Sequence, residues 1–203
     1  MCVKALGLER MPSMKIITID REYGAGGHSV GQAVADRLGV EVYDRDIIKQ
    51  AAMTSGISPE QLEHEEERLT GGDSFINAII PVAFDVKHVV FQNEARAIIE
   101  LAAKGPCVII GRCACAVLKD AGIEAVHVFL HASQEARIAR VGELLGIDDE
   151  DEIRAAIKKR DKQRKAYFDY YTDRHWGDPH EYDLCLASNT CKFLNLSFIL
   201  SNS

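Results

Sequence analysis

The sequence predicts an α/β fold built on a parallel sheet, and two patterns carry this prediction. Short apolar stretches typical of buried strands alternate with longer amphipathic stretches typical of helices. The stretches at residues 107–110 and 125–130 are continuously apolar, as in parallel strands that helices cover on both faces. Strands that alternate with helices pair in parallel through right-handed crossovers, which gives a doubly wound sheet.

The elements expected from these patterns follow one another along the chain. Gly39 ends the first helix, because glycine accepts the left-handed conformation found at helix ends. The predicted strands, about five in number, cover residues 15–20, 40–43, 107–110, 125–130 and 182–186. After the first helix, which ends at Leu38, helices are predicted over about residues 44–54, 58–69, 86–104, 133–146 and 149–170.

Length and composition are those of one globular domain. The chain has 203 residues, of which 47% are hydrophobic and 27% charged, enough for a sizeable core. We expect a poorly ordered leader at residues 1–13, the domain at 14–190 and an atypical tail at 191–203. The formal net charge of −7 argues against general binding to nucleic acid or to an anionic membrane.

The cysteines and the apolar runs indicate a compartment. The six cysteines lack the paired spacing of a zinc site, so we expect reduced thiols, no metal held by them and a cytoplasmic protein. The first 13 residues lack the apolar core of a signal peptide. No apolar run approaches the roughly 20 residues that span a bilayer.

A glycine-rich loop between the first strand and the first helix is the main functional signal. It runs over residues 21–31, and Val30, Val34 and Leu38 follow it at helical spacing. A helix that begins at such a loop directs backbone N–H groups and its positive dipole end toward an anion, usually phosphate. The alternative is a strand-to-helix turn whose glycines serve packing alone.

The loop departs from the usual Walker pattern at the lysine. The register closest to Gly-x-x-Gly-x-Gly-Lys-Gly-Thr puts Arg21 at the first glycine, Gly27 at the lysine and Ser29 at the threonine. A P-loop lysine places a positive charge at the β- and γ-phosphates, so another cation is needed if phosphoryl transfer takes place.

Asp44 and Arg112 follow predicted strands, as the loop does. Ligands of doubly wound sheets bind outside the carboxyl ends of the strands. Three polar features at one edge of the sheet favour a site over three unrelated turns, and Arg112 can hold a phosphate or a base through two hydrogen bonds.

A basic stretch near the end of the chain adds a second signal. Residues 158–165 hold six basic residues in eight, and Arg160 and Arg164 share a helix face, so both can reach one anion. The helix lacks a strong apolar stripe, so we expect it to project from the core as a closing lid. The alternative is a solvated helix face.

Taken together, these motifs resemble the cytidylate kinase-like family. The likeness covers about residues 14–188, and its motifs stand in the family's order. They lie at residues 17–31, 42–48, 108–114, 159–167, 176–179 and 182–184.

The resemblance implies a three-layer P-loop kinase fold. It implies a helical monophosphate-binding insert at about residues 44–90 and a helical lid at about 148–177. The implied activity is transfer of the γ-phosphate of ATP to CMP, dCMP or a related nucleoside monophosphate, with Mg²⁺. Small nucleotides would be the partners, without nucleic acid or membrane, and the protein would be a monomer or a homodimer.

The resemblance also implies roles for individual residues. The donor phosphates would be held by Gly24, Ala25, Gly26, Gly27, His28 and Ser29. Ser29 would also face the metal. The residues that contact the acceptor would be Asp44, Arg112 and Asp161, the last of them from the lid.

For catalysis we expect Arg160 and Arg164 to stabilise the transition state when the lid closes. Arg21 is expected to hold the loop or the bound nucleotide.

The chain departs from the family pattern at the acceptor side as well. Cys113 stands where cytidylate kinases continue with aspartate, and Cys115 stands where the variant family often has an acid. Two other readings therefore stay open. The same fold could phosphorylate another small acceptor, or the protein could be a nucleotide-binding or regulatory module.

Overall fold

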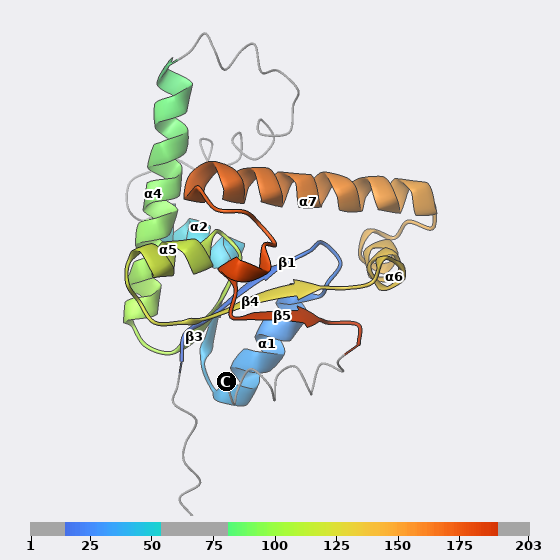
Figure 1. Ribbon diagram of the computed structural model, residues 1–203, viewed down its shortest axis with the longest axis horizontal. Helices are drawn as coiled ribbons and strands as arrows, with labels where there is room; N and C mark the ends of the chain where they lie inside the picture. Colours follow the sequence, from blue (N-terminus) through green and yellow to red (C-terminus); the bar gives the residue numbers. More distant parts are fainter. Residues whose placement is uncertain (1–14, 54–80, 191–203) are drawn as a thin grey trace, which may run out of the picture.

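The computed structural model describes residues 15–53 and 81–190, and its strands form one five-stranded sheet (Figure 1). The order across the sheet is β2-β3-β1-β4-β5, and each neighbouring pair is parallel, as predicted. The strands are β1 (Ile17–Arg21), β2 (Glu41–Tyr43), β3 (Cys107–Ile110), β4 (Val126–His131) and β5 (Leu184–Ala187).

Helices connect these strands along the chain. One of them, α5, was not predicted from the sequence, because five of its seven residues are buried and an amphipathic period is therefore missing. The helices are α1 (Gly27–Leu38), α2 (Arg45–Met53), α4 (Pro81–Ala103), α5 (Ala114–Asp120), α6 (Gln134–Leu145) and α7 (Glu150–Thr172), with a short 3₁₀ turn, η1 (Pro179–Glu181).

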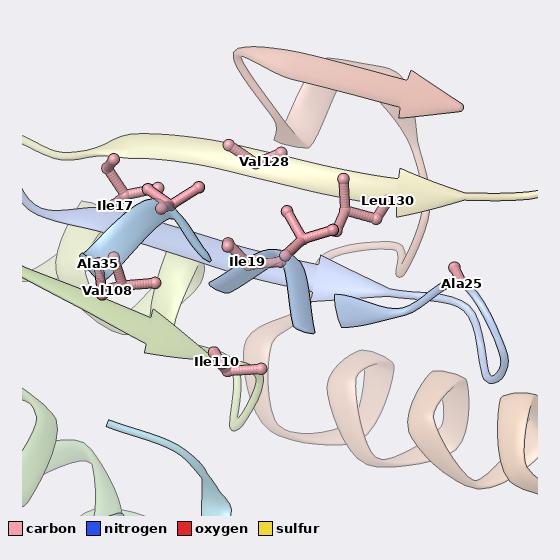
Figure 2. Packing of buried hydrophobic residues seen from close by; sticks show 10 residues of the cluster. Ile17, Ile19, Ala25, Ala35, Val108, Ile110, Val128 and Leu130 are labelled. Carbon is pink, nitrogen blue, oxygen red and sulfur yellow. The ribbon is translucent and has the colours of Figure 1, made fainter. Parts of the chain in front are cut away.

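The sheet lies between two helical layers, which confirms the three-layer fold. On one face, Val30, Val34 and Ala35 of α1 pack against the apolar side chains of the central strands (Figure 2). On the other face, residues of α2, α4 and α5 pack against Ile109 of β3. Alternate residues of a strand point to opposite faces, so continuous apolar strands serve both layers.

The long helix α7 crosses the molecule from α4 to α6 (Figure 1). It does not project from the core, since Ile153, Ile157 and Phe168 are buried. These apolar positions share one helix face with Asp161 and Arg164, which interrupt the stripe. Because these two polar residues leave few apolar positions on that face, the sequence predicted a projecting helix.

Several predicted features lie outside the described residues. They are the leader at residues 1–13, the acidic helix at 58–69 with most of the insert, and the tail at 191–203. Among the helices of the described part of the chain, none has the length and apolar character needed to cross a membrane.

Candidate functional site

The glycine-rich loop leads from β1 directly into α1. Gly24 and Gly26 have φ of 84° and 76°, in the left-handed region that side chains disfavour. Gly26 caps α1, and its carbonyl accepts a hydrogen bond from the Val30 amide at 3.0 Å. The first amides of a helix lack partners within it, so this turn suits an anion.

The side chain of Arg21 runs from Gly27 in this loop to Gly111 after β3. A Cβ atom added to Gly27 would lie 2.6 Å from Cγ and 2.9 Å from Cδ of Arg21. A Cβ atom added to Gly111, after β3, would overlap Nη1 of the same arginine. Burial lowers the pKa of Arg21, while the neighbouring carboxylate of Asp20 acts to raise it. The guanidinium therefore lies between the loop and the end of β3.

Tyr23 is held through its backbone by both α6 and α7. Its amide donates a hydrogen bond to Oδ1 of Asp161 at 2.7 Å, and its carbonyl accepts one from Nε of Arg137 at 2.8 Å. Arg137 also forms ion pairs with Asp161 and, at 3.3 Å, with Glu22. The structure thus places Asp161 against the glycine-rich loop, whereas the sequence analysis expected it to contact the acceptor.

Arg164 also contacts the start of the loop. Its Nη1 donates to the carbonyl of Arg21 at 2.9 Å, and its guanidinium carbon lies 5.5 Å from the centre of the Tyr23 ring. Burial and the nearby charge of Arg21 lower the pKa of Arg164 to about 9. Arg160 is exposed, with Nη1 3.5 Å from Oε1 of Gln163. The two arginines expected to act together therefore have different surroundings.

Arg140 of α6 also contacts the glycine-rich loop, although the sequence analysis did not single it out. Its Nη1 donates to the Gly24 carbonyl at 2.9 Å, and a Cβ atom on Gly26 would lie 2.6 Å from the same nitrogen. Arg137 and Arg140 stand three apart, so they share a helix face. The same spacing argument that singled out Arg160 and Arg164 could have found this pair.

Arg112 follows β3 and contacts residues of two helices. It pairs with Glu94 of α4, and the side chains are 10% and 1% exposed, respectively. Tyr167 of α7 donates its hydroxyl to Oε2 of Glu94 at 2.7 Å, and the Arg112 guanidinium carbon lies 5.2 Å from the Tyr167 ring centre. Arg112 is thereby held from both α4 and α7.

Asp44 lies where β2 passes into α2. Its Oδ1 accepts hydrogen bonds from the amides of Asp46 and Ile47 at 3.1 and 3.2 Å, so it caps α2. Its Oδ2 lies 3.8 Å from Nδ1 of His28 in the loop. The ends of β1 and β2 therefore meet at one edge, as the topology predicts.

Positive charge accumulates at this edge. Burial lowers the pKa of Arg45 and of Lys49 on α2, and the charge of Arg112 lowers both further. The positive charge of Arg160 also lowers the pKa of Arg45. Neighbouring cations on α2, on α7 and after β3 suit an anionic ligand, because an anion would relieve their repulsion.

Cys113 and Cys115, where the chain departs from the family pattern, face the core. They are 2% and 1% exposed. Cys115 donates to Oδ2 of Asp20 at 3.4 Å, and the Tyr182 hydroxyl donates to the same oxygen at 3.4 Å. Burial raises the pKa of Asp20 and of both thiols.

Ser29 is exposed in the first turn of α1. The part of the chain that the structure describes has no group of three or more His, Cys, Asp or Glu side chains that could hold a metal ion. A magnesium ion would fit beside the Ser29 hydroxyl, because Mg²⁺ prefers oxygen ligands and commonly takes several from substrate phosphates and water.

The parallel sheet, the glycine-rich loop and the basic edge together define a P-loop kinase. The chain belongs to the cytidylate kinase-like family, whose model matches residues 16–190. No curated protein matches the chain in sequence.

Solved structures agree with this fold. A crystal structure of an uncharacterized protein from Eubacterium ventriosum is 25% identical, covers 91% of this chain and 98% of its own, and has a TM-score of 0.66. The shikimate kinase of Acinetobacter baumannii, solved with shikimate, is 18% identical over 95% of this chain and 97% of its own, with a TM-score of 0.51. A gluconokinase from Sinorhizobium meliloti 1021 is 16% identical over 94% of this chain and 95% of its own, also with a TM-score of 0.51.

Proposed function

We propose that this phosphotransferase moves the γ-phosphoryl group of ATP to a nucleoside monophosphate, with CMP or dCMP as the first candidates. The observation that carries the proposal is the presence of several cations around the phosphate loop and the end of β3. A second phosphorylated ligand beside ATP needs positive charge on both sides of the transferred group. The contributing side chains are Arg21, Arg45, Lys49, Arg112 and Arg140.

In the proposed reaction, an acceptor phosphate oxygen attacks the γ-phosphorus. The new oxygen–phosphorus bond forms, the bond from the γ-phosphorus to the bridging oxygen breaks, and ADP leaves with that electron pair. The loop amides and Arg140 hold the donor phosphates, and Arg112 orients the acceptor. Bound Mg²⁺, beside Ser29, would neutralise phosphate charge.

A second candidate is phosphorylation of a different small acceptor. Its specific support comes from Cys113 and Cys115, which stand at positions where the family pattern has an acid. Both cysteines are buried, so neither contacts the acceptor in place of that acid. Shikimate kinase and gluconokinase share the fold, so shikimate and gluconate belong in any screen.

An ADP-release screen tests both candidates. Purified full-length protein with Mg·ATP is assayed against the common nucleoside monophosphates, shikimate and gluconate. Faster ADP release with CMP or dCMP than with other acceptors supports the first candidate, and a preference for a non-nucleotide supports the second. If the protein binds Mg·ATP but no acceptor speeds ADP release, a nucleotide-binding module replaces both.

A further inference from the structure

We propose that Arg21 does the work of the P-loop lysine, and that position 27 is glycine so that the Arg21 side chain can occupy the lysine's space. The inference rests on the proposed function, since it assumes that the loop binds ATP phosphates. On this proposal, the missing lysine at position 27 and the arginine at position 21 are linked, because the arginine side chain replaces the lysine side chain.

The first argument is one of space. A side chain at position 27 would leave the first turn of α1 and meet the stem of Arg21, because its Cβ atom would lie 2.6 Å from Cγ and 3.2 Å from Cβ of that residue. Contacts this close force one side chain to move. Arg21 and a lysine at position 27 therefore compete for one place inside the loop.

The second argument concerns where the charge goes. The Arg21 guanidinium reaches Gly111, whose φ of 74° and missing side chain leave room for it. The Gly111 amide donates to the Ile19 carbonyl at 3.0 Å, so the end of β3 lies directly beside the end of β1. A cation at this junction lies between the donor loop and the acceptor side, where γ-phosphate charge develops.

The third argument is that the Arg21 backbone is held in place. Arg164 donates to the Arg21 carbonyl at 2.9 Å and stacks on Tyr23. Arg164 is therefore a positioning residue, and Arg21 is the residue that reaches the phosphates. This assignment reverses the expectation from the sequence, in which Arg164 acted on the transition state and Arg21 held the loop.

The chemistry needs only electrostatics and hydrogen bonds. The guanidinium donates N–H groups to phosphate oxygens and stays protonated while the acceptor oxygen bonds to the γ-phosphorus and ADP leaves. The planar guanidinium of arginine can donate two parallel hydrogen bonds to a phosphate, a geometry that the lysine ammonium does not match, so it can replace the lysine's point charge from a different backbone position.

The test is to reverse the exchange. Four full-length proteins are compared: the wild type, Gly27→Lys, Arg21→Gly, and the double variant, which has the Walker glycine at position 21 and the Walker lysine at position 27. Urea unfolding measures stability, and calorimetry measures the Kd of Mg·ATP. A matched control combines Arg21→Gly with His28→Lys, which returns the charge at the exposed neighbouring position.

If the inference holds, Arg21→Gly weakens Mg·ATP binding by about tenfold or more, as expected for a lost charged hydrogen bond. The double variant then recovers affinity to within about threefold of the wild type, and the His28→Lys control does not. Gly27→Lys alone lowers the urea midpoint, and Arg21→Gly relieves that loss.

The inference would be overturned if the two substitutions had independent, additive effects on both stability and Mg·ATP affinity. It would also be overturned if the His28→Lys control recovered as much Mg·ATP affinity as the double variant. The failure of the proposed function looks different, because the wild type itself would then bind no Mg·ATP. In that case the urea midpoints still decide whether the two side chains compete for one space.

Discussion

At the scale of single residues, Arg112 is a strand-end arginine whose side chain is held by its neighbours. Its guanidinium is oriented by Glu94 and by the face of Tyr167, so its geometry is set before any ligand arrives. Preorganised donors of this kind bind an anion without further ordering. We therefore expect Arg112 to act on the acceptor more than on ATP.

The variants Arg112→Ala and Arg112→Lys test this expectation. Both should raise the KM for the acceptor by about tenfold or more, with a smaller change in the KM for ATP, because a lysine keeps the charge but not the two parallel hydrogen bonds. Steady-state kinetics with each substrate varied in turn measures the split. Equal increases in both KM values would contradict the assignment, and circular dichroism controls for misfolding of the alanine variant.

His127 is a buried residue whose effect is on stability. It is 4% exposed in β4, and its Nδ1 lies 2.8 Å from Oγ1 of Thr18 on β1. Burial lowers its pKa from the ordinary value of 6.5, against the attraction of Asp183. The unfolded chain therefore takes up this proton at a higher pH than the folded protein does.

Stability should consequently fall as the pH drops below about 6.5, because the unfolded state then binds more protons. The expected slope from this group is at most about 1.4 kcal/mol per pH unit. Urea unfolding between about pH 7.5 and pH 5.5 measures it. His127→Asn, which retains a polar atom near Thr18, should remove this component, whereas replacement of the exposed His180 should leave it. An unchanged slope in His127→Asn would exclude the mechanism.

At the scale of elements, α6 and α7 act together as a clamp on residues 21–23. Asp161 lies at its centre, since it accepts from the Tyr23 amide and pairs with Arg137. The buried residues Ile153 and Ile157 pack α7 onto Val141 of α6, so the two helices hold the loop from one packed unit. The basic helix is therefore coupled to the glycine-rich loop in this structure.

Asp161→Ala should loosen the clamp. The Tyr23 amide would lose its acceptor, so its hydrogen exchange should speed up by about tenfold or more, and Mg·ATP affinity should fall as the loop loses order. Hydrogen exchange monitored by NMR measures the first effect, and calorimetry measures the second. Asp151→Ala removes the same charge from an exposed site on α7 and serves as the control. Unchanged exchange at Tyr23 would show that the hydrogen bond does not protect it.

At the scale of the whole molecule, the sheet order brings the two proposed sites together. β1 and β3 are neighbours, with Ile19 opposite Ile110, so the donor loop and Arg112 leave adjacent strand ends. Parallel strands end at the same edge, which is why doubly wound sheets bind their ligands there.

A bisubstrate molecule that joins two nucleosides through a chain of phosphates should therefore bind more tightly than ATP. We expect a gain of about a hundredfold in Kd for a linker of suitable length, because binding of the second end becomes intramolecular. Calorimetry with a series of phosphate-chain lengths measures it. If no length binds more tightly than ATP, donor and acceptor do not occupy neighbouring sites.

Much of this molecule could be predicted from local sequence signals. Continuous apolar stretches and the glycines after β1 depend on short-range physics, so the parallel sheet, the loop and the position of Arg112 at a strand end were predictable. The element α5 was missed because it is short and buried almost throughout. The helical spacing of Arg137 and Arg140 is visible in the sequence, but their contact with a loop far away in the chain is not.

The sequence by itself determined the succession of strands along the chain, the phosphate-loop signature and the candidate cations Arg21, Arg112, Arg160 and Arg164, because each depends on neighbours in the chain. Only the tertiary structure decided which of those cations meets which backbone group. Arg21 and Gly27 share one space, and Arg164 holds the Arg21 carbonyl, through contacts that no local pattern specifies. The reason is physical: where a long side chain lies is decided by the volume and hydrogen bonds that packed elements leave to it.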